Sequence, residues 1–549
     1  MSLCSSTKCV LLADNDPDVY DSACFLLEAA GYTIKAAQSL AEGKQLLKEE
    51  IIHAAVIDLR LTDNQHPEDI SGFALGNELP DHIPFVIFTA YRDIDNLRHA
   101  MSEVGAKDVI DKNASDASEQ LLYAVEKLFA EHVKPNFDLA IRGSVDPSEV
   151  AAQIELPHAT GREKTARAET SRVATGDDIC IILRTLFSTA TRITVRYLFE
   201  EYANTMASHS GAVLLCVYPE YTNGHPGAPM VVKFSSRIKI AQEEENYENL
   251  MRYIGGTRLA VLDQSASSHH IGALSYRLLG QADPNGLRHF YDLFRDPKMD
   301  AKILGDKLVH FLREAFQIIY ASAEEREVNL LTHYADCLNL SPTKLLVCSE
   351  SVDIKWEDGQ TYWPEVGFHL PDPISWVLAG EAWRGYPIKT KLCLCHGDLH
   401  SRNILVDSAM GFWLIDFERA IVSHCLRDFA ELETDIKFQL SSFSGLEEYY
   451  QLETMLADES AFFPNPDTPL FDEPLPPAVD RAFQIIRGLR LLMKDRFPTA
   501  QKAIEYDLAL LMSTLNVIRL HTTTRASQRL AYFSAGLLCK KIRNDMVHQ

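Results

Sequence analysis

Long apolar runs are missing from this chain of 549 residues, and so is an excess of positive charge. No window reaches the roughly 18 apolar residues that a membrane-spanning helix needs, and the chain does not open with a basic segment followed by an apolar run. The formal net charge of -24 argues against nucleic acid as a partner, because a duplex binder needs a basic surface. We therefore expect a protein that binds neither a membrane nor nucleic acid.

Paired cysteines are also missing. The eleven cysteines form no CxxC pair and no cysteine–histidine cluster at zinc spacing. Such scattered cysteines are typical of reduced thiols in a reducing compartment. We expect a cytoplasmic protein, and no pattern in its sequence specifies an oligomeric state.

The length exceeds what one hydrophobic core holds, so we predict a multidomain protein. Residues 8–131 alternate short apolar strands with amphipathic helices, which predicts an α/β doubly wound domain with a five-stranded parallel sheet. The expected strands are 9–13, 32–36, 53–58, 84–89 and 107–111.

Three further regions follow. Residues 132–178 favour a linker, in which 134–157 could hold a short helix and 158–178 are polar and without apolar periodicity. Residues 179–283 are rich in strand patterns, and residues 284–549 are mostly helical up to the C-terminus. We interpret the last two regions as the small and large lobes of one bilobal α+β domain.

Acidic residues stand at the expected carboxyl ends of two strands in the first domain. Asp14 and Asn15 follow the first strand, and Asp58 ends the third. Sites form at this edge of an open parallel sheet, and gathered carboxylates need a hard cation such as Mg²⁺. Thr89 and Lys112 end the fourth and fifth strands, so a hydroxyl and an ammonium join the same site.

With these positions in order, residues 8–131 resemble a response-regulator receiver domain. The resemblance implies that Asp58 accepts a phosphoryl group from a sensor histidine kinase. It also implies that Asp14, Asn15 and Asp58 hold Mg²⁺, and that Thr89 and Lys112 contact the phosphoryl oxygens. Asn15 stands where this family usually has a second carboxylate.

A second group of polar residues lies in "HGDLHSRN" (396–403) and "IDFE" (415–418). The apolar runs between these segments predict a hairpin that brings Asp416 beside Asn403. The amide oxygen of Asn403 and the carboxylate of Asp416 suit Mg²⁺, which leaves Asp398 to accept a hydroxyl proton.

This pair of segments resembles the aminoglycoside phosphotransferase and choline kinase family. The resemblance implies that Asp398 is the catalytic base, that Asn403 and Asp416 bind Mg²⁺, and that His396 supports the loop. It also makes Asp428 a carboxylate that braces the loop from a helix. We interpret His400 as structural.

The strand-rich lobe offers residues for ATP. By the same resemblance Lys233, in "VVKF", contacts the phosphates. The next helix offers Glu243, Glu244 or Glu245 as its partner, and we choose Glu243. Gly211 belongs to the turn that would cover the phosphates. A lysine in a strand and a glutamate early in a helix are also common structural features.

These observations predict a receiver-regulated, ATP-dependent phosphotransferase that transfers the γ-phosphoryl group to a hydroxyl of an unknown small-molecule acceptor. One alternative is a two-component signalling scaffold with a nucleotide-binding pseudokinase domain, and another is a protein kinase. The single glycine of the phosphate-covering turn favours the scaffold, whereas Asp398, Asn403 and Asp416 favour an enzyme.

Overall fold

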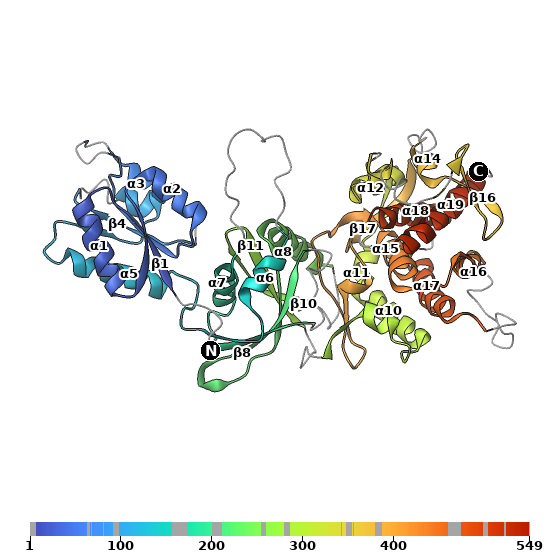
Figure 1. Ribbon diagram of the computed structural model, residues 1–549, viewed down its shortest axis with the longest axis horizontal. Coiled ribbons are helices and arrows are strands. Elements are labelled where there is room, and N and C mark those ends of the chain that lie inside the picture. Colours follow the sequence, from blue (N-terminus) through green and yellow to red (C-terminus); the bar gives the residue numbers. More distant parts are fainter. Residues whose placement is uncertain are drawn as a thin grey trace. The chain divides into compact units, whose positions relative to one another are not determined.

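The computed structural model describes most of the chain (Figure 1). The described residues are 7–62, 66, 69–80, 82–91, 98–155, 174–199, 211–253, 260–278, 286–341, 343–346, 354, 356–378, 387–458, 474–497, 503–520 and 523–547. Two compact units divide the chain: residues 1–240 with 262–277, and residues 241–261 with 278–549. Within the described part, no helix has the length and apolar character that crossing a bilayer requires.

A five-stranded parallel sheet with the order β2-β1-β3-β4-β5 forms the N-terminal domain (Figure 1, blue). Its strands are β1 (Lys8–Ala13), β2 (Tyr32–Ala37), β3 (Ala54–Ile57), β4 (Phe85–Thr89) and β5 (Val109–Asp111). All four contacts between neighbouring strands are parallel. The predicted five-stranded parallel sheet is therefore confirmed, and its strands lie within a few residues of the expected ranges.

Helices cover both faces of this sheet because the strand side chains alternate between two cores. Val10 and Val56 face a core shared with α1 (Pro17–Ala29) and α5 (Ala117–Glu131). Leu11 and Ile57 face the opposite core, to which α3 (Ser71–Gly76) contributes. Helix α2 (Leu40–Glu49) and the π-helical turn η1 (Ala100–Val104) complete this domain.

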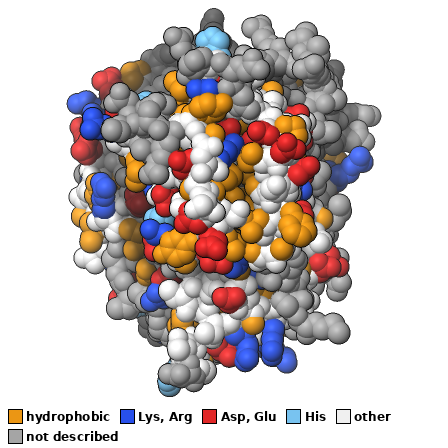
Figure 2. All heavy atoms as spheres, turned by 90° about the vertical axis from the view of Figure 1, so that its left-hand side faces the viewer, with side chains coloured by type: hydrophobic (Ala, Val, Ile, Leu, Met, Phe, Trp, Pro, Cys, Tyr) orange, Lys and Arg blue, Asp and Glu red, His pale blue; other side chains and the backbone are white. Residues whose placement is uncertain are grey.

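Figure 2 shows one face of the molecule, where hydrophobic side chains (orange) lie among acidic ones (red). The exposed hydrophobic side chains of the N-terminal domain include Phe25 on α1 and Tyr123 on α5. Its surface therefore mixes apolar groups with negative charge.

The prediction of a linker over residues 132–178 was wrong for its first part. Residues 140–143 form strand β6 (Ala140–Gly143), which pairs with β7 (Arg192–Tyr197), and residues 147–153 form helix α6 (Pro147–Gln153). Helix α6 agrees with the short helix expected within residues 134–157, whereas strand β6 was not expected. The remainder, residues 156–173, lies outside the described residues.

A six-stranded sheet with the order β10-β11-β9-β8-β7-β6 follows. The β6–β7 contact is parallel, while β7–β8, β8–β9 and β9–β11 are antiparallel. The remaining elements of this region are β8 (Val213–Glu220), the short 3-10 turn η3 (Thr222–Gly224), β9 (Met230–Ser236), β10 (Ala260–Ser268), β11 (Ile271–Leu278), α7 (Gly176–Leu186) and α8 (Arg237–Met251). Helix α8 thus follows β9 in the chain and precedes β10.

Helices predominate in the rest of the chain (Figure 1, yellow to red). Those described are α9 (Phe290–Arg295), α10 (Ala301–Ala315), α11 (Gln317–Ala321), α12 (Leu330–Cys337), α14 (Pro373–Leu378), α15 (Arg427–Asp435) with the π-helical turn η6 (Ile436–Leu440), α16 (Leu446–Ala457), α17 (Pro477–Arg496), α18 (Ala503–Arg519) and α19 (Arg525–Val547). The buried Glu433 of α15 joins Arg490 of α17 and Tyr506 of α18, so charged and polar groups connect three of these helices in the interior.

Three small sheets accompany these helices, with the orders β12-β18-β19, β13-β17-β20 and β14-β15-β16. Their strands are β12 (Arg288–His289), β13 (Glu324–Val328), β14 (Trp356–Glu357), β15 (Gln360–Trp363), β16 (Phe368–Pro371), β17 (Ile388–Cys395), β18 (Ile404–Val406), β19 (Phe412–Leu414) and β20 (Ile421–His424). The loop 396–403 connects β17 to β18, and its last residues form the 3-10 turn η5 (Ser401–Asn403).

Candidate functional site

The N-terminal domain gathers two buried carboxylates and a lysine at the carboxyl edge of its sheet. Asp14 follows β1 and Asp58 follows β3, and their exposed fractions are 1% and 2%. Lys112 Nζ lies 2.7 Å from Asp14 Oδ2 and 2.9 Å from Asp58 Oδ2. One ammonium group therefore bridges both acids, as the order of the strands predicts.

The oxygen atoms at this edge fit a hard cation. Burial raises the pKa of Asp14, an effect that the nearby Lys112 offsets in part. Asn15 has a buried side-chain oxygen, Oδ1, that lacks a hydrogen-bond partner among the described residues. A buried oxygen of this kind costs free energy unless a donor or a cation meets it. Asp14, Asn15 and Asp58 thus offer the donor set that Mg²⁺ prefers.

Thr89 ends β4 and is buried, as expected for a hydroxyl at the same edge. Its Oγ1 accepts a hydrogen bond from the backbone N–H of Tyr91 at 3.2 Å. The guanidinium carbon of Arg60 lies 3.3 Å from the centre of the Tyr91 ring. The sequence analysis did not single out Arg60. Its position two residues after Asp58 could have indicated that it lies near this edge of the sheet.

In the C-terminal unit, hydrogen bonds bring together the residues of the two polar segments. Strands β18 and β19 form the expected hairpin, and Ile415 N–H donates to Asn403 O at 3.1 Å. The amide of Asn403 donates in turn to Asp398 O at 2.9 Å. Asp416 has a φ of +69°, a left-handed conformation that is uncommon for residues other than glycine and is frequent at functional sites.

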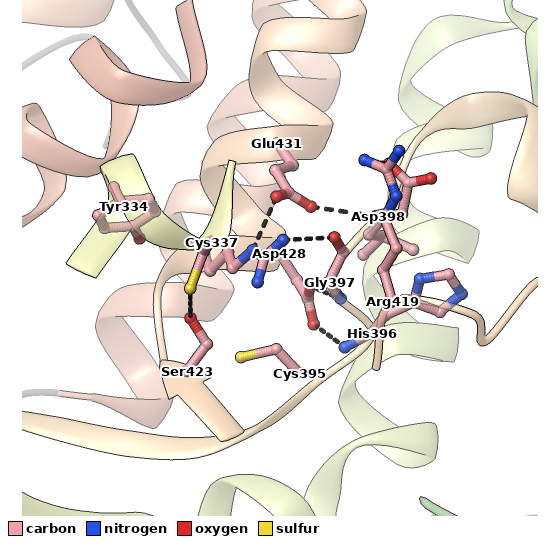
Figure 3. Close-up of polar contacts among 12 residues, drawn as sticks. Tyr334, Cys337, Cys395, His396, Gly397, Asp398, Arg419, Ser423, Asp428 and Glu431 are labelled. Carbon is pink, nitrogen blue, oxygen red and sulfur yellow. Dashed lines mark hydrogen bonds and ion pairs between the residues drawn. The ribbon is translucent and has the colours of Figure 1, made fainter. Parts of the chain in front are cut away.

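Helix α15 supports loop 396–403 with a row of carboxylates (Figure 3). Asp428 accepts the N–H groups of His396 and Gly397 at 2.8 and 2.9 Å. Glu431 accepts Leu399 N–H at 3.3 Å. One turn further along α15, Asp435 Oδ2 accepts the backbone N–H of Ser401 in the loop at 2.7 Å. Burial raises the pKa of each of these three carboxyl groups.

The sequence pattern indicated only the first of these carboxylates. Asp428, Glu431 and Asp435 are separated by three and then four positions, which places them on one face of a helix. Arg427 adds a link on the same side, because its Nη2 donates to Gly397 O at 2.6 Å and its Nε to Glu431 Oε1 at 2.8 Å. The spacing alone would have predicted such a row.

Asp398 projects from this braced loop with a side chain that is 34% exposed. Arg419 Nη1 lies 3.7 Å from one carboxylate oxygen, and His400 Nε2 lies 4.0 Å from the other. His400 also accepts Arg402 N–H through its Nδ1 at 3.2 Å. The carboxylate of Asp398 is thus accessible and faces two basic side chains.

His396 lies on the inner side of the loop. Its ring is buried, which lowers the pKa of the imidazole, and its Nε2 lies 3.1 Å from Ile415 O. Because a carbonyl oxygen can only accept, Nε2 carries the proton in this hydrogen bond. His396 thereby joins the loop to the segment that contains Asp416.

The residues proposed for ATP lie on the strand-rich part and on α8. Lys233 is buried on β9, and Glu243 is buried on α8. Glu243 Oε1 accepts Phe417 N–H at 3.4 Å, and Asn246 Nδ2 donates to Phe417 O at 3.1 Å. Helix α8 therefore holds Phe417, the residue next to Asp416, through two hydrogen bonds. This contact was not predicted from the sequence.

Gly211 has a φ of +67°, and a Cβ atom there would lie 2.6 Å from the Cβ of Glu155. The left-handed φ and this close approach explain why the residue at position 211 is a glycine. Residues 208–210, the first three of the predicted phosphate-covering turn at 208–215, lie outside the described residues.

The parallel sheet with its acidic edge and bridging lysine defines the N-terminal domain as a receiver. In agreement, residues 10–126 match the family described as response regulator receiver domain. Residues 358–518 match a second family, described as ternary complex associated domain 9. The receiver match supports the predicted N-terminal receiver domain.

Two curated relatives are similar to part of this chain. The transcriptional regulatory protein GlrR of Escherichia coli (strain K12) is 26% identical over 172 residues, which are 29% of this chain and 38% of GlrR. The photosynthetic apparatus regulatory protein RegA of Cereibacter sphaeroides is 32% identical over 112 residues, which are 20% of this chain and 58% of RegA. The chain thus spans well under two thirds of either relative.

The solved structures that are similar to part of this chain include response regulators. A response regulator receiver domain protein from Methanospirillum hungatei JF-1 is 24% identical, with a TM-score of 0.21, and the match covers 23% of this chain and 96% of that chain. A response regulator from Chloroflexus aurantiacus J-10-fl is 26% identical, with a TM-score of 0.20, covering 23% and 99%.

Proposed function

We propose that this protein is a receiver-regulated phosphotransferase. The observation that carries the proposal is the joined geometry of Asp398, Asn403 and Asp416. The Asn403 side chain donates to Asp398 O, and the Asn403 backbone accepts from the residue before Asp416. These hydrogen bonds bring the chain segments of the three residues together, and the side chains of Asn403 and Asp416 carry oxygen atoms of the kind that Mg²⁺ prefers.

Each residue has a separate task in this proposal. Asp398 takes the proton of the acceptor hydroxyl, the hydroxyl oxygen bonds to the γ-phosphorus of ATP, and ADP leaves. Asn403 and Asp416 hold Mg²⁺, which offsets the charge of the phosphate groups when it is bound. Asp428 and Glu431 keep the loop in place from beneath.

The strand-rich region supports the same proposal. Four antiparallel strands in the order β7-β8-β9-β11, the buried Lys233 on β9 and the buried Glu243 on the following helix suit a lobe that holds a nucleotide. The bond from Phe417 N–H to Glu243 gives that helix a direct contact with the Mg²⁺-binding segment. The acceptor is a small molecule with a hydroxyl group in this proposal.

In this proposal, phosphorylation of the receiver domain regulates the second domain. Asp58 takes a phosphoryl group from the phosphohistidine of a sensor histidine kinase, with Mg²⁺ held by Asp14, Asn15 and Asp58 itself. Lys112 lies between the two acids and can follow the new phosphoryl oxygens. Phosphorylation acts on the second domain only if the two states of the receiver make different contacts with it.

A second candidate function is an assembly component without turnover. It is favoured by the match of residues 358–518 to the family described as ternary complex associated domain 9. That match includes both polar segments, 396–403 and 415–418. In this alternative the C-terminal domain binds nucleotide or partner proteins, and the receiver controls the assembly.

Labelled ATP distinguishes the two. The full chain is incubated with γ-labelled ATP, Mg²⁺ and a cell extract as the source of acceptors, beside Asp398→Asn and the control Asp306→Asn, an exposed residue of α10. We expect label transfer by the wild type and the control and a loss of about 100-fold or more in Asp398→Asn. Equal transfer by all three proteins, or transfer by none of them, would contradict the proposed phosphotransferase activity with Asp398 as its base.

A further inference from the structure

Two arginines contact the loop 396–403 in different ways. Arg427 is 2% exposed, and its Nη2 donates to Gly397 O at 2.6 Å. Arg419 has a side chain that is 56% exposed, and among the described residues the one partner of its guanidinium group is Asp398, at 3.7 Å. Arg427 thus supports the loop from the interior, whereas Arg419 presents most of its donors to solvent.

The backbone of Arg419 is fixed beside the loop. A Cβ atom at Gly397 would lie 2.1 Å from Arg419 O, so the two chain segments are in direct contact. The N–H of Ala420 donates to Phe417 O at 3.1 Å and closes a turn around this position. The side chain of Arg419 extends from this turn toward Asp398 (Figure 3). Its place next to the proposed base therefore follows from the path of the backbone.

The contact between Arg419 and Asp398 is a loose ion pair. A hydrogen bond between a cationic nitrogen and a carboxylate is about 2.7–2.9 Å long. Arg419 Nη1 instead lies 3.7 Å from Asp398 Oδ1. Exposed ion pairs contribute little to stability. The guanidinium group can therefore leave Asp398 for a better anionic partner at little cost.

The carboxylates beneath the loop do not need the charge of Arg419. Asp428 accepts the N–H groups of two consecutive loop residues at 2.8 and 2.9 Å. Glu431 accepts a third N–H of the loop and pairs with Arg427 at 2.8 Å. The positive charge of Arg419 is therefore available on the open side of the loop, where Asp398 lies.

The acceptor of the proposed reaction has to reach the same carboxylate. Its hydroxyl donates to Asp398, so the rest of the acceptor lies close to the Arg419 side chain. A guanidinium group presents a planar set of donors that matches a carboxylate or a phosphate group. A cationic group at this place would meet a like charge. An acceptor with an anionic group near its hydroxyl suits both residues.

We propose that Arg419 binds a carboxylate or phosphate group of the acceptor and so selects anionic acceptors over neutral and cationic ones. The anionic group replaces Asp398 as the partner of the guanidinium group, which frees the Asp398 carboxylate for the acceptor hydroxyl. This inference rests on the proposed phosphotransferase function, and it specifies the chemical class of the small molecule that receives the phosphoryl group.

Calorimetric titration of the full chain with small hydroxyl compounds tests this selection in the presence of Mg²⁺ and ADP. Glycerate and glycerol 3-phosphate carry an anionic group, whereas glycerol is neutral and choline is cationic. We expect at least one of the two anionic compounds to bind the wild type about tenfold more tightly than glycerol or choline, because hydrogen bonds to charged groups are strong. In Arg419→Gln this preference should disappear.

The matched control is Arg326→Gln. Arg326 is another exposed arginine that pairs with one carboxylate, that of Glu324 at 2.6 Å, and its substitution should leave the preference intact. Arg419→Lys keeps the charge without the planar set of donors, so it should retain part of the preference. The proposal is overturned if neither anionic compound binds, if all the compounds bind the wild type equally, or if the preference persists in Arg419→Gln.

Label transfer separates this inference from the function on which it rests. A cell extract is divided by anion exchange into a bound, anionic fraction and an unbound fraction, and each is offered with γ-labelled ATP. We expect transfer to the bound fraction. In Arg419→Gln, the amount of this fraction needed for half-maximal transfer should rise about tenfold, while the KM for ATP stays unchanged.

The other outcomes of the transfer experiment are distinct. Transfer confined to the unbound fraction, or a raised KM for ATP alone in Arg419→Gln, overturns the role of Arg419 and leaves the phosphotransferase in place. Transfer to neither fraction contradicts the phosphotransferase and therefore the acceptor, and the titration then shows whether the anion site exists without it.

Discussion

At the scale of single residues, Gly397 is a position of loop 396–403 where no side chain fits. Its φ is +76°, and a Cβ atom would lie 2.1 Å from the backbone oxygen of Arg419. Gly359 has a similar φ of +71° with open space around it. An alanine at position 359 therefore measures the cost of the left-handed backbone without a steric clash. We expect Gly359→Ala to lower the free energy of unfolding by about 1 kcal/mol and Gly397→Ala by about 2–4 kcal/mol. Urea unfolding of the two variants checks this, and equal losses would contradict the clash.

A buried histidine gives a prediction for pH. Burial is the largest effect on His53 and lowers its pKa to about 4, so the folded chain does not take up the proton that unfolded histidine binds below about 6.5. The contribution of neutral His53 to stability is thus complete above pH 6.5 and falls as the pH decreases toward 4, by up to about 3 kcal/mol.

The measurement is the urea midpoint of the wild type at about pH 7 and about pH 4.5, which bracket most of this change. In His53→Asn the midpoint should depend less on pH than in the wild type, whereas the exposed His132→Asn should retain the full dependence. The same pH dependence in His53→Asn and the wild type would show that His53 is not the group that titrates.

At the scale of elements, the contact between α8 and the IDFE segment decides how Asp416 is held. Asn246 Nδ2 donates to Phe417 O at 3.1 Å and to Glu418 O at 2.7 Å. Asn246→Ala should therefore lower the free energy of unfolding by about 1–2 kcal/mol and weaken Mg²⁺–ATP binding. The control is the exposed Asn249→Ala on the same helix, which should change stability by less than about 0.5 kcal/mol. Urea unfolding and calorimetric titration measure both quantities, and equal behaviour of the two variants would refute a holding role for Asn246.

Elements with strong periodicity were predictable from the sequence, and those that depend on distant partners were not. The five receiver strands are short apolar runs bounded by turns, so their order also predicted where Asp14, Asp58 and Lys112 meet. Strand β6 was missed because its pairing with β7 joins residues about fifty positions apart. Glu431 and Asp435 were missed although their helical spacing was visible, and Arg419 because only the fold brings it near Asp398.

At the scale of the whole molecule, the chain joins a signalling input to a second domain through a structured connection rather than a free tether. Strand β6 and helix α6 belong to the sheet region, and Arg184 fixes the segment that precedes them. A change in the receiver can therefore reach the strand-rich region through packed side chains. Such coupling needs two arrangements of this connection with different free energies.

The central claim is that Asp58 controls phosphoryl transfer at Asp398. The most direct measurement is the rate of label transfer from γ-labelled ATP to extract acceptors, with and without acetyl phosphate, for the wild type, Asp58→Asn and the exposed control Asp21→Asn. We predict that acetyl phosphate changes the rate in the wild type and in Asp21→Asn and leaves Asp58→Asn unchanged. Transfer that responds equally in all three proteins would contradict control through Asp58.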